Sequence, residues 1–144
     1  MKDAAFALLG FGAAFTFLWL IWNIICIIGG WKVLTKAGEA GWKSIIPVYS
    51  SYIYFKISWN PIMFWIMVAF AAIGACLGQS EETFLTLIGS ICSLTSTLLV
   101  ILQNIRLARA FGHGTLYGLG LFFLGPIFIV LLGFGGSQYI GPQK

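Results

Sequence analysis

The feature that most constrains this chain is a series of long stretches without charge. No Asp, Glu, Lys or Arg occurs between Ala4 and Gly30, and comparable charge-free stretches cover residues 57–80, 83–105 and 110–143. About 20 predominantly apolar residues cross the ~30 Å hydrocarbon core of a bilayer. The chain is 60% hydrophobic and only 8% charged, whereas a soluble domain carries roughly 25% charge. The pattern therefore predicts a membrane protein.

We predict an all-α integral membrane protein that forms a single domain over residues 1–144. The first apolar stretch is longer than the core of a cleaved signal peptide, about 7–15 residues, and it lacks a small-residue cleavage site. Pro61 suits the first turn of a helix, where its missing N–H is no loss. The four transmembrane helices are expected at about 6–29, 61–78, 84–108 and 116–134.

Orientation follows from where the charges lie between these spans. Four lysines occupy the first connection and Arg106 and Arg109 lie at the third, whereas the second holds Glu81 and Glu82. Cytoplasmic connections are enriched in Lys and Arg. The first and third connections are therefore expected in the cytoplasm, with the N- and C-termini outside.

The first connection contains a segment that we call the elbow, residues 42–57. Its uncharged part, Ser44–Phe55, has twelve residues and would rise about 18 Å as a helix, which is too short to cross the core. An amphipathic helix in the interface, or one that dips in and returns, fits better, and Pro47 should begin it or bend it. A candidate surface for anionic lipid headgroups or a protein partner comprises Lys32, Lys36, Trp42, Lys43, Lys56, Arg106 and Arg109.

Two stripes of small and polar residues lie inside the predicted spans. Residues spaced by three and four along a helix share one face. One stripe contains Thr16 and Asn23, and another contains Ser90, Ser93 and Thr97. The simplest arrangement packs the two stripes together inside a bundle, as small residues commonly do in membranes. The functional alternative is a neutral polar path lined by Thr16, Asn23, Ser90, Ser93 and Thr97.

The residues that usually perform chemistry are sparse. His113 is the only histidine, and all four carboxylates lie near a terminus or in connections, so neither a metal site nor a cofactor is predicted. Lys43 and Ser44 are neighbours, and adjacent helical residues do not face each other. Catalytic residues are therefore not assigned. Nucleic acid is not an expected partner, because the basic residues lie beside apolar spans.

The elbow also carries a recognisable pattern. Lys36-Ala37-Gly38, then Gly41-Trp42, then Ile46-Pro47-Val48-Tyr49 resembles a family of small bacterial four-helix membrane proteins of unknown function. Segments 107–112 and 132–135 resemble its other recurring parts. Such proteins are often labelled signal peptidase I, but the serine and lysine of that enzyme and its soluble catalytic domain are missing here. The resemblance implies a bacterial inner membrane protein without a settled activity.

These observations favour a non-catalytic accessory or interaction component that uses its cytoplasmic basic elbow, in contact with the bilayer and its anionic headgroups. A protein partner or a homo-oligomer is compatible with the same surface. The alternative is a small oligomeric channel or transporter with a neutral polar path. An enzyme is less favoured than either, because no nucleophile and base are paired in the sequence.

Overall fold

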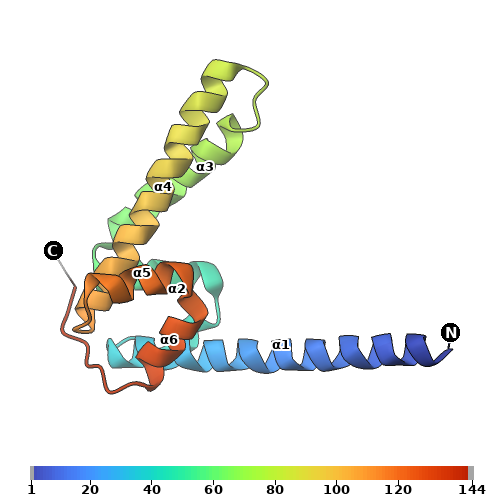
Figure 1. Ribbon diagram of the computed structural model, residues 1–144. Helices are drawn as coiled ribbons and strands as arrows, with labels where there is room; N and C mark the ends of the chain where they lie inside the picture. The colour runs from blue at the N-terminus through green and yellow to red at the C-terminus, as the bar shows by residue number, and fades with distance from the viewer. Residues whose placement is uncertain (1, 143–144) are drawn as a thin grey trace.

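The computed structural model describes residues 2–142, and within them every regular element is helical. The all-helical fold class is therefore confirmed. Two helices, α1 and α4, are long and apolar enough to cross a membrane by length and composition. The elements, drawn in Figure 1, are α1 Lys2–Lys36, the 3₁₀ helix η1 Gly41–Ser44, α2 Pro47–Ser58, α3 Pro61–Leu77, α4 Thr83–Ala110, α5 Thr115–Phe123 and α6 Gly125–Phe134.

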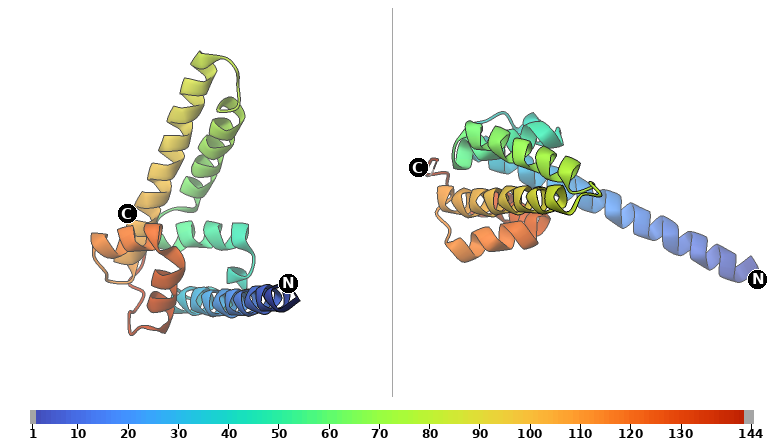
Figure 2. Two further views of the ribbon diagram at one scale, coloured as in Figure 1. Left: turned by 45° about the vertical axis from the view of Figure 1, so that its right-hand side comes forward. Right: turned by 90° about the horizontal axis from the view of Figure 1, so that it is seen from above.

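The buried core lies where the helices meet and not along their lengths. We call this junction the hub; its buried residues are Val33, Leu34, Ile53, Ile57, Leu107, Ala108, Ala110, Phe111, Leu121 and Leu132. They come from α1, α2, α4, α5 and α6 and from the residue that follows α4. Two arms leave the hub in different directions, α1 alone and the α3–α4 hairpin, as Figures 1 and 2 show.

The hairpin arm is held together by small residues. A Cβ atom added to Gly74 would meet Ser93 and the backbone of Gly89, and one added to Gly89 would meet the backbone of Gly78. The hydroxyl of Ser96 donates to the carbonyl of Met67 across the pair at 3.3 Å. Such side chains let two helices approach closely, so the hairpin packs tightly without large residues between its helices.

The α1 arm is apolar and uncovered over most of its length. Phe6 and Phe11 are 74% and 78% exposed, and nothing lies within 4 Å of a Cβ added to Gly12. Only the C-terminal part docks, where Gly29 lies against Val130 and Gly133 of α6. A helix of 35 residues rises about 52 Å, so most of α1 projects beyond the hub.

The fourth predicted span, 116–134, is not one helix. The chain leaves helical geometry at Leu124, with φ −125° and ψ 43°, and α6 then begins with Gly125-Pro126. Proline lacks the N–H that would continue the ladder and disfavours a helical residue before it. The two pieces have 9 and 10 residues, about 14–15 Å each, so neither crosses a hydrocarbon core alone. Residues 116–134 therefore form two short helices in place of the single helix that the sequence predicts.

The break also redirects the C-terminal tail. Because α6 turns back, the tail returns to the hub, where Tyr139 donates its hydroxyl to the carbonyl of Ile57 at 2.7 Å. The N–H of Ile140 donates to the carbonyl of Ala110, also at 2.7 Å. The sequence predicts this tail on the membrane face opposite the basic connections. In the fold, Tyr139 and Ile140 contact α2 and the end of α4.

Several helix starts and ends agree with the sequence prediction. Pro47 and Pro61 begin α2 and α3, and Asn60 caps α3 by accepting from the N–H of Ile62 at 2.9 Å. Gly38 and Gly112 follow α1 and α4 with φ of +79° and +77°, a region that favours glycine. The turns that lead from α1 into the elbow and from α4 into α5 thus depend on two glycines.

Candidate functional site

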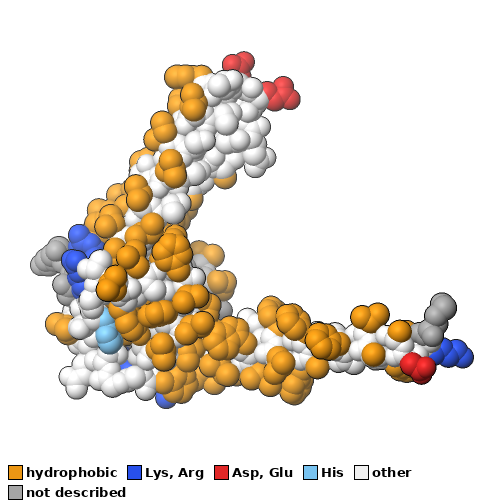
Figure 3. Space-filling view, viewed as in Figure 1, with side chains coloured by type: hydrophobic (Ala, Val, Ile, Leu, Met, Phe, Trp, Pro, Cys, Tyr) orange, Lys and Arg blue, Asp and Glu red, His pale blue; other side chains and the backbone are white. Residues whose placement is uncertain are grey.

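Basic side chains surround the hub at the ends of helices. Lys36, Lys56 and Arg109 lie in the last turns of α1, α2 and α4. A cation at a helix C-terminus is favoured by the partial negative charge of the unpaired carbonyls there. Figure 3 shows Lys and Arg side chains at the hub, acidic side chains at the tip of the hairpin, and acidic beside basic side chains at the free end of α1. The hub is therefore where most of the basic side chains gather.

Lys36 caps a helix other than its own. Its Nζ donates to the carbonyls of Leu132 and Gly135 at 2.8 and 2.6 Å. Helix α6 contains no basic residue in its last turn, so α1 supplies the cation. Lys32 reinforces this contact with its Nζ 4.0 Å from the ring centroid of Phe134. We predicted both lysines as surface residues, but nothing in the sequence indicated that they bind α6.

Glu39 joins two further lysines of the candidate surface. Its carboxylate accepts from Lys43 and from Lys56, each at 2.6 Å, and its side chain is 14% exposed. Hydrogen bonds from Lys43 and then Lys56 hold the pKa of Glu39 below its usual range. This clamp joins the connection after α1 to η1 and to α2. We predicted that Lys43 and Lys56 lie at the ends of the elbow, and their shared carboxylate was missed.

The two arginines of the surface lie on the same hub. The guanidinium of Arg106 stacks 4.1 Å from the ring centroid of Trp59, and Arg109 donates to the hydroxyl of Thr115 at 3.0 Å. Among the described residues, Glu39 is the carboxylate that pairs with lysines of the hub, namely Lys43 and Lys56. Lys32 and Lys36 contact a ring and backbone carbonyls instead, and Arg109 contacts a hydroxyl. Cations therefore outnumber carboxylates among these described side chains.

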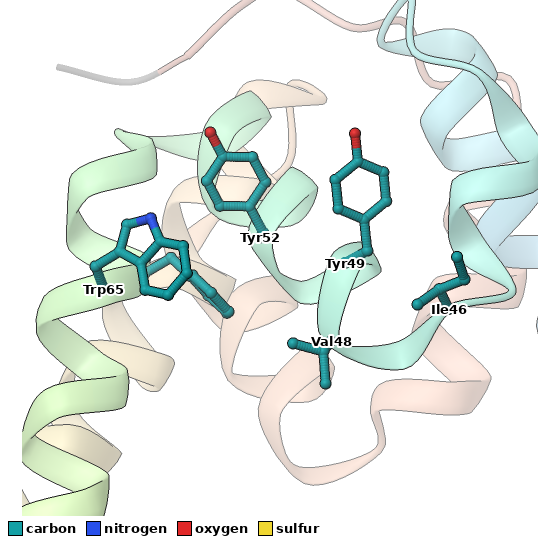
Figure 4. A pocket seen from close by; sticks show the side chains of 6 residues that line it. Ile46, Val48, Tyr49, Tyr52 and Trp65 are labelled. Carbon is teal, nitrogen blue, oxygen red and sulfur yellow. The ribbon is translucent and has the colours of Figure 1, made fainter.

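An aromatic groove adjoins these cations on the elbow (Figure 4). Trp42 stacks on Tyr49 with centroids 6.3 Å apart, and Tyr49 stacks on Tyr52 at 6.2 Å. Trp65 from α3 approaches Tyr52 with centroids 6.5 Å apart. The groove encloses about 390 Å³ and is lined by Ile46, Val48, Tyr49, Tyr52, Phe64 and Trp65. Trp42 was assigned to this surface, whereas Phe64 and Trp65 were assigned only to a span.

The two polar stripes lie on separate arms. Helix α1 packs against α6 and η1, and α4 packs against α3, α5 and α2. Thr16 donates to the carbonyl of Gly12 at 2.8 Å, Ser90 to that of Thr86 at 2.8 Å and Thr97 to that of Ser93 at 3.0 Å. Ser93 lies against Gly74 of α3. The structure therefore does not bring Thr16 and Asn23 together with Ser90, Ser93 and Thr97.

The docked end of the α1 stripe lines what we call the polar cavity. Asn23, Cys26 and Gly30 border a space of about 360 Å³ together with Ser44, Ser50 and Tyr54, and the far wall includes Gly125 and Pro126. The hydroxyl of Tyr54 lies closest to Gly30, where an added Cβ would approach it within 3.2 Å. Asn23, Cys26 and Gly30 of the predicted α1 stripe thus lie beside the elbow and α6, whereas Thr16 does not line this cavity.

The fold and the hub define an all-helical protein with a basic junction at the ends of helices, two of them long enough to cross a membrane. A family of unknown function, DUF5684, matches residues 42–142, and the chain belongs to this family. The matched part contains η1 from Trp42 onward, all helices from α2 to α6, and the tail. No curated protein and no solved structure matches the chain.

Proposed function

We propose that the protein is a non-catalytic component of the membrane whose hub lies at the bilayer surface and binds anionic lipid headgroups. The observation that carries this proposal is the gathering, among the described residues, of Lys32, Lys36, Lys43, Lys56 and Arg109 beside the carboxylate of Glu39, at the ends of α1, η1, α2 and α4. The other described carboxylates, Asp3, Glu81 and Glu82, lie at the far ends of the arms.

The electrostatic attraction between exposed basic side chains and an anionic membrane supports binding of the hub to a lipid surface. A lysine or arginine near an anionic membrane contributes about 1 kcal/mol to attraction. Lys32 and Arg109 are both exposed, so their charges remain available beyond the hub. The aromatic groove offers a neighbouring apolar surface on which acyl chains can lie, and tyrosine and tryptophan rings are favoured at the headgroup level.

The proposed topology places the hub on the cytoplasmic side, following the positive-inside rule. Helices α1, α3 and α4 cross the bilayer, and the tips of both arms lie outside. Helices α5 and α6 enter from the cytoplasmic side and return to it. Non-helical backbone within a membrane is tolerated where protein covers it. The N-terminus is then outside and the tail inside, within a bacterial inner membrane as the family resemblance implies.

The test uses the full chain reconstituted in vesicles that contain phosphatidylcholine and phosphatidylglycerol. Lipid retained after gentle extraction is measured by mass spectrometry, and phosphatidylglycerol should be enriched over its share in the vesicle. Arg109→Gln should lower the enrichment about fivefold, which corresponds to about 1 kcal/mol. Added salt should lower it as well.

Lys2→Gln is the matched control, because it removes the same charge at the far end of α1. It should leave the enrichment of phosphatidylglycerol unchanged. Equal retention of the two lipids by the unmodified protein would refute the proposal. So would an equal effect of the two substitutions, since the hub would then have no particular role.

A further inference from the structure

The polar cavity contains hydrogen-bonding groups that no other part of the fold explains. Asn23 comes from α1, Ser44 from η1, and Ser50 and Tyr54 from α2, and all four line the same space. Most of the remaining lining is apolar, with Ile27, Pro47, Pro126 and Ile129. An apolar cavity with a few convergent polar groups is the usual form of a small-molecule site. Its volume of about 360 Å³ falls within the range of such sites, about 300–1,000 Å³.

Two of the polar side chains that line this cavity already donate a hydrogen bond to a backbone carbonyl. The Nδ2 of Asn23 donates to the carbonyl of Trp19 at 2.8 Å, and the hydroxyl of Ser44 is directed to the carbonyl of Ile27 at 3.4 Å. The amide oxygen of Asn23 and the lone pairs of Ser44 remain as acceptors. The hydroxyls of Ser50 and Tyr54 line the same space, and each can both donate and accept. The cavity therefore presents acceptors on the side of Asn23 and Ser44 and hydroxyls on the side of α2.

The cavity is also electrically neutral. Its lining contains no carboxylate, lysine or arginine, and burial raises the pKa of Tyr54 to about 12, so the phenol stays protonated at physiological pH. A charged ligand would lose its hydration without gaining a counter-ion, which is costly. A cation would in addition be repelled by the neighbouring lysines of the hub. The cavity thus favours an uncharged ligand that donates hydrogen bonds.

The surface next to the cavity is suited to an apolar chain. Ile27 lines the cavity, and the exposed side chains of Ile24 and Leu20 continue from it along α1 at 56% and 48% exposure. Residues three and four apart share a helix face. A ligand with a polar head in the cavity would therefore find a continuous apolar track beside it.

We propose that the polar cavity binds an uncharged lipid alcohol, whose single hydroxyl proton is shared between the oxygens of Asn23 and Ser44 while its chain lies along α1. This site is separate from the cations of the hub and from the proposed binding of anionic headgroups. A lipid ether or ester of the same length lacks the donor. The cavity should therefore distinguish an alcohol from the corresponding methyl ether.

The experiment uses the full chain in phosphatidylcholine nanodiscs and two photoactivatable probes. One is hexadecanol with a diazirine in its chain, and the other is its methyl ether. Cross-linked residues are mapped by mass spectrometry. The alcohol should label the α1 segment around 20–27 about two- to tenfold more than the ether, as expected for loss of one hydrogen bond. Asn23→Leu and Ser44→Ala should each reduce alcohol labelling toward the level of the ether.

Ser51→Ala provides the matched control, since Ser51 lies on α2, is exposed and donates to the carbonyl of Pro47 at 2.9 Å. It should label like the unmodified protein. Equal labelling by alcohol and ether, or labelling spread evenly over residues 6–20, overturns the proposal. Circular dichroism shows whether each variant folds. If Asn23→Leu does not fold, Ser44→Ala tests the proposal by itself, because it removes only one oxygen atom. Undiminished alcohol labelling in a folded Ser44→Ala protein would also overturn it.

Discussion

The two arms that leave the hub differ in how their apolar helices are covered. Both are apolar helices that start from one buried junction. The hairpin arm pairs α3 with α4 through Gly74, Gly78 and Gly89, so each helix covers part of the other. The α1 arm has no such partner within the described chain over its first two dozen residues. Apolar character and small residues are common to both arms, but a Cβ added to Gly10 or Gly12 of α1 meets nothing within 4 Å. The difference teaches that glycine permits close packing only where a second helix lies beside it, as α3 lies beside α4 in the hairpin.

The largest expected effect concerns the side of the membrane on which each arm ends. If both arms cross the bilayer, Gln79→Cys at the hairpin tip should react with an impermeant maleimide added from outside. Gln138→Cys in the tail should not react until the membrane is opened, because the tail lies on the hub. Labelling is measured in a background in which Cys26, Cys76 and Cys92 are replaced by alanine. Reaction of both positions from the same side would contradict the re-entrant arrangement of α5 and α6.

The next largest effect should be a difference in stability between glycine substitutions in the two arms. Gly89→Leu places a side chain against the backbone of α3 and should lower the free energy of unfolding by about 3 kcal/mol, as overpacking does. Gly12→Leu, in α1, meets nothing within 4 Å and should change it by less than about 0.5 kcal/mol. Unfolding in mixed micelles gives both values. Equal losses would show that α1 is covered by a partner that the single chain does not contain.

Substitutions in the docked C-terminal end of α1 should lower the free energy of unfolding, whereas substitutions in the exposed part of α1 should not. Lys36→Met leaves the carbonyls of Leu132 and Gly135 without their cation and should cost about 2 kcal/mol, the scale of a hydrogen bond to a charged group. Lys32→Met removes only a contact with the ring of Phe134, worth about 0.5–1 kcal/mol. Hydrogen exchange at Gly135 should accelerate in the first variant. If the two variants behave alike, the cap contributes little to docking.

The smallest effect should come from the clamp at Glu39. Glu39→Gln removes both ion pairs and should lower stability by about 1 kcal/mol at neutral pH. Because the pKa of Glu39 is lowered in the folded state, its contribution is complete above about pH 5. It declines as the pH falls below the ordinary carboxyl pKa of about 4.3. The stability curves of the unmodified protein and the Glu39→Gln variant should therefore converge in acid, while Glu82→Gln at the hairpin tip should not alter the curve.

Some of this architecture could be predicted from the sequence because it depends on local chemistry. Pro47 and Pro61 start helices, and Gly112 follows the end of one, for reasons that each residue carries itself. The concentration of basic residues beside the elbow was also evident. The partners of those residues could not be predicted, since Lys36 contacts carbonyls 96 and 99 positions away. Spacing indicates which residues share a face and does not indicate which helix that face meets.

The broken fourth span and the separated stripes show this limit most clearly. Gly125-Pro126 was visible in the sequence, but proline is tolerated within transmembrane helices when neighbours satisfy the freed groups. The face of α1 that contains Asn23 was predicted, and its expected partner was α4. The structure pairs its docked end with Ser44, Ser50 and Tyr54 because the elbow lies between the two arms. Residue spacing in one sequence does not indicate which distant segment packs against this face of α1.

The contact between Lys36 and α6 has a consequence for the order in which contacts form during synthesis. Helix α1 leaves the ribosome before α6, since the carbonyls that Lys36 binds are about a hundred residues later in the chain. At about 5–20 residues per second, this amounts to a wait on the order of 5–20 s. Helix α1 can contact η1 early in that interval, because η1 follows it closely in the chain. Its contact with α6 is therefore formed late in synthesis.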